Sequence, residues 1–233
     1  MSDFFKDIYQ NRADAYHQMI AAEDAEQQLL PAIEQIVSLQ DKRVIDLGSG
    51  TGRFPVLLNG RPLASLTAVD LHEGMLREQM RQRTRLQGHW RLLQGDLCDL
   101  PFAAGCADVV MVGWAMGHFQ SWFADHWQEK VRRAVAEMTR ITAAGGTLLI
   151  FETMGTGTPS AAPPKSGLAS YYQFLEQELS FQRQVIATDF LFDTVEQAVA
   201  SLEFFFPFLA ERIAEKQWTR VPEWTGIWSR SVS

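Results

Sequence analysis

The feature that most constrains the fold is a run of alternating glycines, Gly48, Gly50 and Gly52, directly after an apolar stretch at residues 43–47. Such a short, β-branched stretch is typical of a buried strand. Glycine adopts positive φ and puts no Cβ between backbone and ligand, so the chain can turn sharply here and lie against a bound molecule. Residues 54–58 predict a helix whose free N–H groups point into the turn. The sequence therefore predicts a strand–loop–helix site for a nucleotide-like ligand.

The spacing of these glycines narrows the class of ligand. A dinucleotide fingerprint, G-x-G-x-x-G, requires a third glycine where the helix packs closely on the strand. Counted from Gly48, that position is Arg53, so a nicotinamide-dependent oxidoreductase is disfavoured. A phosphate-binding loop ending in Gly-Lys-Ser or Gly-Lys-Thr is also missing, because no lysine follows the glycines.

Two acidic residues follow the next two predicted strands, at 66–70 and 90–94. Asp70 lies about 20 residues beyond the glycines, the separation at which a carboxylate meets a ribose diol in nucleotide-binding α/β folds. A helix-capping role is the alternative for Asp70. Asp96 falls at the same sheet edge and can accept a hydrogen bond from an adenine amine, with Asp99 as the competing acid.

The rest of the chain alternates strands and helices, which predicts an α/β fold with a mostly parallel sheet. A long stretch at 155–167, rich in Gly, Pro, Ser and Thr, predicts a functional or mobile loop. The further predicted strands span 107–112, 147–152, 185–192 and 220–229, and the predicted helices span 3–37 (two apolar stripes, the first including Phe5), 72–85, 125–141, 168–181 and 195–206.

Composition excludes several classes of protein. The chain has 233 residues, enough for one generous domain over 1–233, and a net charge of −7, which disfavours a nucleic-acid partner. Cys98 and Cys106 have neither metal-site nor redox spacing, and Asp125 with His126 lacks further metal ligands, so no metal is expected. Neither a secretory signal nor a membrane-spanning run is visible. We therefore expect a cytoplasmic protein with no membrane partner.

Four features occur together: Asp46-x-Gly48-x-Gly50-x-Gly52, Asp70, Gly95-Asp96, and the strand at 107–113 followed by Trp114. In order and spacing this chain resembles the class I S-adenosylmethionine (SAM)-dependent methyltransferases, of the bacterial small-molecule type, over residues 44–152. The resemblance implies a three-layer αβα Rossmann-like fold whose seven-stranded sheet has the order 3-2-1-4-5-7-6, with the last strand antiparallel. It further implies an N-terminal helical cap at 1–40, a SAM-binding half at 41–153 and a substrate-side half at 154–233.

The resemblance also implies how SAM, the expected cofactor, is bound. Asp46 would order the loop, the glycines would approach the methionine moiety and ribose, and Gly113 would offer its carbonyl to the ammonium group. Asp96 and Leu97 would hold the adenine, with Met75 packed on it. Arg12 and Tyr16 are candidates for the methionine carboxylate and the lid. The expected cofactor-binding residues are Asp46, Gly48, Ser49, Gly50, Gly52, Asp70, Leu71, Met75, Asp96, Leu97, Gly113, Trp114, Arg12 and Tyr16.

Methyl transfer from a sulfonium is an in-line displacement that depends mainly on orientation and exclusion of water. His118 is the predicted general base if the acceptor carries a hydroxyl or protonated amine, and a histidine hydrogen-bonded within the wall is the alternative. His17, Tyr172 and Glu152 are the next candidates.

The aromatic residues near the site indicate an apolar or planar small-molecule acceptor, and the protein is expected to be a monomer or homodimer. A non-catalytic SAM sensor remains an alternative to the enzyme. These aromatic residues are Trp114, Phe119, Tyr171, Tyr172 and Trp224.

Overall fold

The computed structural model describes residues 8–233, so the predicted helical residues 3–7, with Phe5, lie outside the described residues. A seven-stranded sheet forms the middle layer and has the order β3-β2-β1-β4-β5-β9-β6. The strands, in sheet order, are β3 Arg91–Gln94, β2 Ser65–Asp70, β1 Arg43–Leu47, β4 Ala107–Gly113, β5 Thr142–Thr156, β9 Glu223–Ser231 and β6 Gln182–Ala187. The first five are parallel, and β9 is antiparallel to both of its neighbours. Because β7 and β8 form a separate sheet, β9 is the seventh strand of this sheet along the chain, and the predicted order 3-2-1-4-5-7-6 is confirmed.

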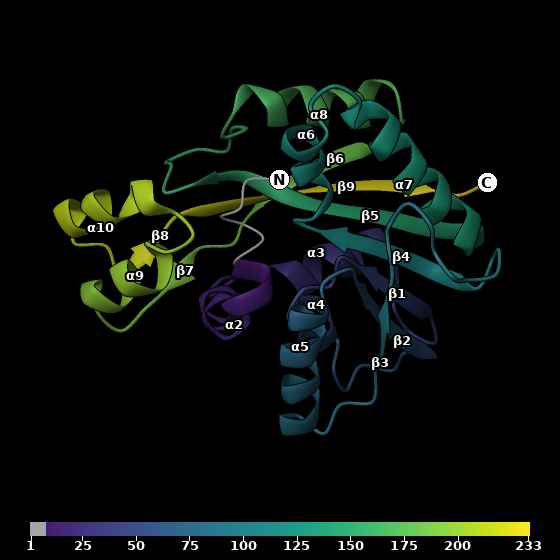
Figure 1. Ribbon diagram of the computed structural model, residues 1–233, viewed down its shortest axis with the longest axis horizontal. Coiled ribbons are helices and arrows are strands. Elements are labelled where there is room, and N and C mark those ends of the chain that lie inside the picture. Colours follow the sequence, from purple (N-terminus) through teal and green to yellow (C-terminus); the bar gives the residue numbers. More distant parts are fainter. Residues whose placement is uncertain (1–7) are drawn as a thin grey trace.

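Helices cover both faces of the sheet, which gives the three predicted layers (Figure 1). On one face pack α3 (Leu29–Ile36) and α4 (Arg53–Leu57), and α5 (Glu73–Arg85) lies against β2 and β3. On the other face pack α7 (Trp127–Ile141) and α8 (Ser166–Gln177). The apolar stripe of α7 packs there as its helical spacing predicts, buried from Val131 to Ile141 and partly buried at Trp127.

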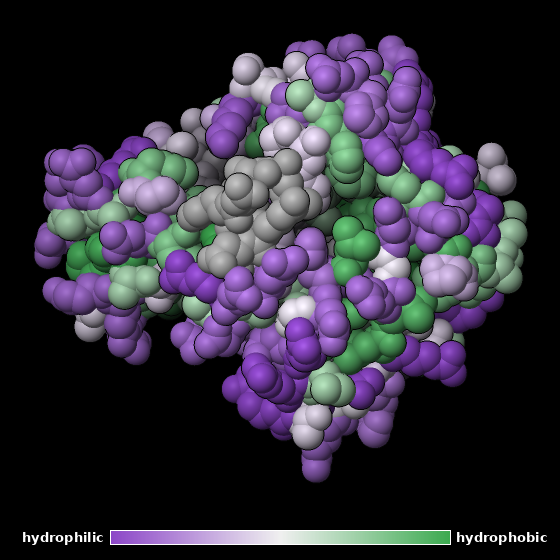
Figure 2. All heavy atoms as spheres, in the orientation of Figure 1, coloured by the Kyte–Doolittle hydropathy of each residue, from purple (hydrophilic) through white to green (hydrophobic). Residues whose placement is uncertain are grey.

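A small lobe extends from the sheet on the side of α2 (Ala13–Ala21) (Figure 1). It contains β7 (Phe190–Leu191), α9 (Val195–Leu202), the 3-10 turn η2 (Pro207–Leu209), α10 (Ala210–Lys216) and β8 (Arg220–Val221). Its own apolar core includes residues of α2, so the N-terminal helix and the lobe pack as one unit. Phe208 stays 68% exposed on this lobe, where apolar side chains reach the surface (Figure 2).

The single strand predicted at 185–192 is wrong in its second half. β6 ends at Ala187, and β7 pairs instead with β8 in a separate two-stranded sheet. The turn between them is polar, because Asp189 accepts a hydrogen bond from the Glu223 amide and pairs with Arg220. Proline 222 separates β8 from β9 within the predicted strand 220–229.

Other boundaries also differ from the prediction. Strand β5 continues to Thr156, so the loop predicted at 155–167 is shorter, and α8 begins at Ser166. The short helices α6 (Phe119–Trp122) and α10 are absent from the predicted elements. Within residues 8–233, no helix is long and apolar enough to cross a membrane.

Candidate functional site

Two adjoining cavities open where strands β1, β2, β3 and β4 end, at the sheet edge that the sequence predicts. The larger is lined by Tyr9, Tyr16, Gly48, Gly50, Asp70, Leu71, His72, Met75, Asp96, Leu97, Gly113, Trp114, Ala115, His118, Phe119 and Trp122. The smaller is lined by Tyr16, Ile20, Asp46, Gly48, Ser49, Gly50, Thr51, Arg53, Phe54, Gly113 and Trp114. Five residues line both cavities, so together they form one elongated site.

The glycine loop forms the floor shared by the two cavities. Gly48 has a φ of +60°, and a Cβ built on it would lie 2.6 Å from the Ala115 side chain. Only glycine therefore fits where the loop passes beneath the segment that follows β4. Gly52 lines neither cavity, and its φ of +99° places it at the start of α4.

Asp70 ties the loop to the end of β2. Its Oδ2 accepts a hydrogen bond from the Gly50 amide (2.8 Å), and its Oδ1 accepts one from the His72 amide (2.8 Å). Burial raises the pKa of this carboxyl group, and the two amide donors oppose that shift. Each carboxylate oxygen has a second lone pair, so Asp70 can also accept hydrogen bonds from a diol.

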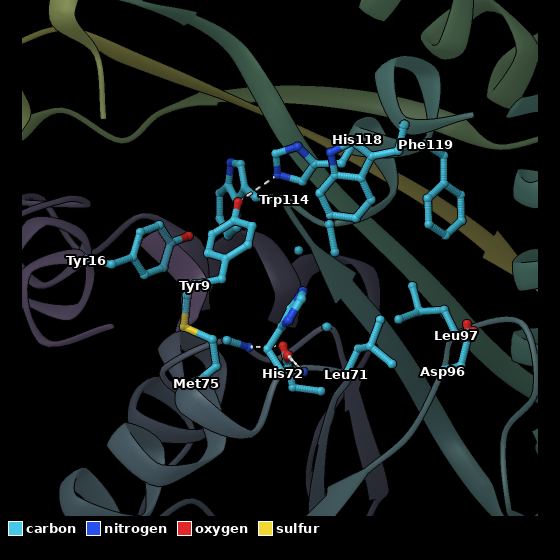
Figure 3. Close-up of a pocket in the computed structure, with 16 residues that line it drawn as sticks. Tyr9, Tyr16, Leu71, His72, Met75, Asp96, Leu97, Trp114, His118 and Phe119 are labelled. Atoms are coloured by element: carbon cyan, nitrogen blue, oxygen red, sulfur yellow. Dashed lines mark hydrogen bonds between the residues drawn. The ribbon is translucent and has the colours of Figure 1, made fainter. Parts of the chain in front are cut away.

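The far end of the larger cavity is flat and apolar. Leu71 and Leu97 lie across it from Met75 and Tyr9 (Figure 3), and Leu71 is 47% exposed. Asp96 is exposed at the rim, and its Oδ1 accepts a hydrogen bond from the Cys98 amide (2.8 Å). The competing acid of the prediction, Asp99, is absent from the described lining of both cavities.

The smaller cavity is lined by an acidic and a basic residue, Asp46 and Arg53, and each has buried polar atoms without a partner among the described residues. Both carboxyl oxygens of Asp46 are buried and have no hydrogen-bond partner among the described residues, so they make no such bond to the loop. Burial raises the pKa of Asp46 well above its ordinary value, and the charge of Asp70 adds to the shift. Nη2 of Arg53 is likewise buried without a partner in the described chain. The cavity thus offers an acidic and a cationic group to one ligand.

The N-terminal candidates differ in their placement. Tyr16 lines both cavities, and burial raises its pKa to about 12. Arg12 is exposed, and its guanidinium lies over the Phe204 ring at 4.8 Å, apart from the described lining of either cavity.

His118 lies in the 3-10 turn η1 (Met116–His118), opposite the glycine loop. Its Nε2 is 2.8 Å from the Tyr9 hydroxyl, and the two side chains point toward each other (Figure 3). Its ring stacks on Trp122 at 4.7 Å. Burial lowers the pKa of His118 to about 4, so the imidazole is neutral near pH 7. It can therefore accept a proton, but it is a weaker base than a solvated histidine.

The other base candidates line neither described cavity. His17 hydrogen-bonds Thr51 (3.2 Å), and the Tyr172 hydroxyl donates to the Thr153 carbonyl (2.6 Å). Glu152 lies behind η1, and its Oε1 accepts a hydrogen bond from the Gly117 amide (2.8 Å). The residues 8–233 contain no group of three His, Cys, Asp or Glu side chains placed to hold a metal ion.

Several functional candidates were missed by sequence reasoning. Tyr9, His72 and Trp122 line the larger cavity, although nothing in their local sequence distinguishes them from core residues. Arg53 served only to exclude a dinucleotide, yet its place one residue after the glycines could have signalled a group facing the loop. Glu23, its ion-pair partner, has no local signal at all.

A parallel sheet with a glycine loop after β1 and an acid after β2 defines the Rossmann-like class of nucleotide-binding α/β proteins. Residues 45–150 match the methyltransferase domain family. This matched segment, a little under half of the chain, is therefore similar to the domain of SAM-dependent methyltransferases.

Two relatives with assigned functions illustrate this family. Malonyl-[acyl-carrier protein] O-methyltransferase of Methylococcus capsulatus is 38% identical over 117 residues, which cover 50% of this chain and 38% of that protein. Demethylmenaquinone methyltransferase of Thermus thermophilus is 27% identical over 161 residues, or 68% of this chain and 66% of that protein. The chain thus spans between two-fifths and two-thirds of the length of these relatives.

Solved structures share the fold at low sequence identity. The YcgJ protein of Bacillus subtilis superimposes with a TM-score of 0.57 at 16% identity, over 89% of this chain and 99% of that one. Phosphoethanolamine N-methyltransferase 2 of Haemonchus contortus, in complex with SAM, gives 0.61 at 14% identity, over 100% of this chain and 61% of that one.

Proposed function

We propose that this protein is a SAM-dependent methyltransferase that acts on a small, planar and largely apolar acceptor. The observation that carries the proposal is that two cavities with different linings adjoin along the same glycine loop. The larger cavity has apolar walls with Asp70 beside the loop, and the smaller has unpartnered atoms of Asp46 and Arg53. A nucleoside joined to an amino acid has the matching division into a flat end and a zwitterionic end.

The residues present fit SAM at each part. A Cβ at Gly50 would meet only the Tyr16 ring, at 3.9 Å, so this face of the loop is open to a ligand. Asp70 would bind the ribose diol, and Leu71, Met75 and Leu97 would enclose the adenine next to Asp96. Asp46 would face the ammonium group, and its raised pKa would return toward the ordinary range beside that cation.

When bound, SAM supplies a methyl group already activated by its sulfonium charge. The protein then has to orient the acceptor and exclude water, which together account for several kcal/mol of a displacement barrier. Tyr9 and His118 join the N-terminal segment to η1 across the larger cavity and exclude water on that side. Neutral His118 would accept the proton from an acceptor hydroxyl through a ring nitrogen.

The acceptor class follows from the walls next to His118. Phe119 and Trp122 line the larger cavity, and the Trp122 ring stacks almost parallel to His118, with an interplanar angle of 8°. Flat aromatic walls favour a planar acceptor. Of the acceptors that the relatives' names give, this is closer to demethylmenaquinone than to malonyl-[acyl-carrier protein]. We assign cofactor binding to residues 41–153. The acceptor walls come from the same part of the chain and from Tyr9 of the N-terminal cap, and no residue of 154–233 is in the described lining of either cavity.

Calorimetry and a methylation screen test this function. The protein should bind SAM and not NAD, and NAD binding without SAM binding would contradict the proposal. A panel of phenols, quinols and amines with radiolabelled SAM should then yield a labelled product. A blank panel with intact SAM binding would favour the sensor alternative.

The variant His118→Ala tests the proposed base on any substrate found. It should leave the Kd for SAM unchanged and lower kcat by about a hundredfold or more, because general-base catalysis typically contributes that much. Unchanged turnover would assign His118 to the wall alone.

A further inference from the structure

Building on the proposed function, we propose that Arg53 binds the carboxylate of the cofactor's methionine moiety and that Glu23 and Trp114 are positioning residues for it. Glu23 has no local signal in the sequence for such a role, and Trp114 was expected at the site without any link to Arg53. Both come from parts of the chain far from the glycine loop: Glu23 from the connection between α2 and α3, and Trp114 from the end of β4.

Glu23 and Trp114 occupy one edge and one face of the Arg53 guanidinium and leave its other edge for a ligand. Nη1 of Arg53 pairs with Oε2 of Glu23 at 2.7 Å, and the guanidinium carbon lies 3.9 Å from the centroid of the Trp114 ring. The opposite nitrogen, Nη2, is buried without a partner among the described residues. Arg53 lines the smaller cavity together with Asp46.

Glu23 is itself held in place from both sides. The amide of Asp24 donates to the Thr188 carbonyl (3.1 Å), and the Ala22 carbonyl accepts from the Leu191 amide (2.9 Å). The second carboxylate oxygen of Glu23, Oε1, accepts a hydrogen bond from the Thr188 hydroxyl at 3.4 Å. Glu23 therefore connects two parts of the molecule. Its backbone neighbours and Oε1 contact the strand region around Thr188, and Oε2 contacts Arg53 beside the glycine loop.

This arrangement suits a guanidinium that must bind one carboxylate while paired with another. The side chains of Arg53 and Glu23 are only 13% and 6% exposed, so the ion pair is little screened by solvent. Burial raises the pKa of Glu23, and the charge of Arg53 opposes that shift. Because a guanidinium has donors on both edges, Glu23 can occupy one edge and the ligand the other.

Binding calorimetry with two ligands tests the proposal without measuring turnover. The ligands are SAM and 5′-methylthioadenosine, a nucleoside thioether that lacks the amino-acid end. Arg53→Met should weaken SAM by about tenfold to a hundredfold, as expected for a lost charged hydrogen bond, and leave methylthioadenosine unchanged. Arg61→Met, an exposed arginine just beyond α4, is the matched control and should change neither Kd.

The positioning role of Glu23 is tested by a double-mutant cycle. Glu23→Gln should weaken SAM severalfold in the wild-type background and have no further effect in the Arg53→Met background, because it acts only through Arg53. Equal effects in both backgrounds, or equal losses for the two ligands, would reject the positioning role. Melting curves without ligand confirm that each variant is folded.

The outcomes separate this proposal from the function on which it rests. Failure of the wild-type protein to bind SAM would contradict the proposed function itself. SAM binding that is unchanged in Arg53→Met would reject only the role of Arg53 as the carboxylate-binding residue. Loss of SAM binding in Arg12→Met would assign the carboxylate to Arg12 instead.

Discussion

Glu152, at the ligand edge of β5, is a buried carboxyl group that the methyl transfer does not require. It is 4% exposed, and burial raises its pKa from 4.5 to about 8. Its hydrogen bond to the Gly117 amide fixes η1, the turn that carries His118. The protonation state of Glu152 therefore affects the position of η1 in the wall of the larger cavity, although Glu152 does not line that cavity.

Replacing Glu152 by Gln should remove a pH-dependent loss of stability. Below about pH 4.5 the carboxyl group is protonated in both the folded and the unfolded state. Between there and about pH 8 only the unfolded state ionises, so the folded state loses stability as pH rises. Urea unfolding measures the free energy of unfolding of both proteins at pH 5 and pH 9. The value for Glu152→Gln minus that for wild type should be larger at pH 9 than at pH 5, by an amount on the order of a few kcal/mol. A difference that stays constant with pH would mean that Glu152 titrates normally.

At the scale of residues, the sequence predicts groups that act next to a local signal. Gly48 could be found because it directly follows a strand, and Asp70 because it ends the next strand about 20 residues beyond the glycines. Glu23 could not, because its pairing with Arg53 joins residues brought together only by the tertiary fold. The same limit applies to Tyr9, whose contact with His118 spans 109 positions of the chain.

Among the elements, the turn between β1 and α4 is under the tightest constraint. Gly48→Ala should lower the free energy of unfolding by about 1–3 kcal/mol and weaken SAM binding, because a Cβ there meets Ala115 at 2.6 Å in a left-handed backbone. Gly60→Ala is the matched control, since its φ is +77° and a Cβ meets nothing within 4 Å. It should cost about 1–2 kcal/mol from the backbone alone and spare SAM binding. Chemical denaturation and calorimetry on both variants measure the two effects, and identical SAM affinities would contradict the close packing of the loop.

The central elements could be predicted because their patterns are local. Strands β1, β2 and β4 are largely apolar runs that end at or just before a glycine or an aspartate, and α7 has a clear helical stripe. The division between β6 and β7 has no such pattern. It depends on Asp189 and Thr188, which bond to the distant Glu223, so pairing across the fold decides where the strand ends.

At the scale of the whole molecule, the sheet is completed by a strand that lies between two earlier ones. Strand β9 pairs with β5 on one side and β6 on the other, and it carries the fully buried Trp228. A chain ending at Val221 should therefore lack a cooperative unfolding transition. Without β9, strand β6 has no partner in the sheet and the core lacks Trp228. Circular dichroism during heating checks this. Removing Ser233 alone is the control and should leave the transition in place.

The order of the sheet was expected from the resemblance to methyltransferases, since the periodicity of single segments does not specify which strands are neighbours. The small lobe was not expected. Its core is shared among α2, α9, α10 and β7, so its existence depends on contacts between segments some 170 residues or more apart along the chain, as when the Leu191 amide donates to the Ala22 carbonyl.

The unpartnered atoms of Asp46 and Arg53 also link the lifetime of the protein to its ligand. Folding buries both carboxyl oxygens of Asp46 and Nη2 of Arg53 without a hydrogen-bond partner among residues 8–233, and under the proposed function a bound zwitterion would supply these partners. A ligand present at a hundred times its Kd adds about 2.7 kcal/mol to the stability of the fold. Proteases cleave the unfolded form, so the level of this protein in a cell should rise and fall with the supply of that ligand.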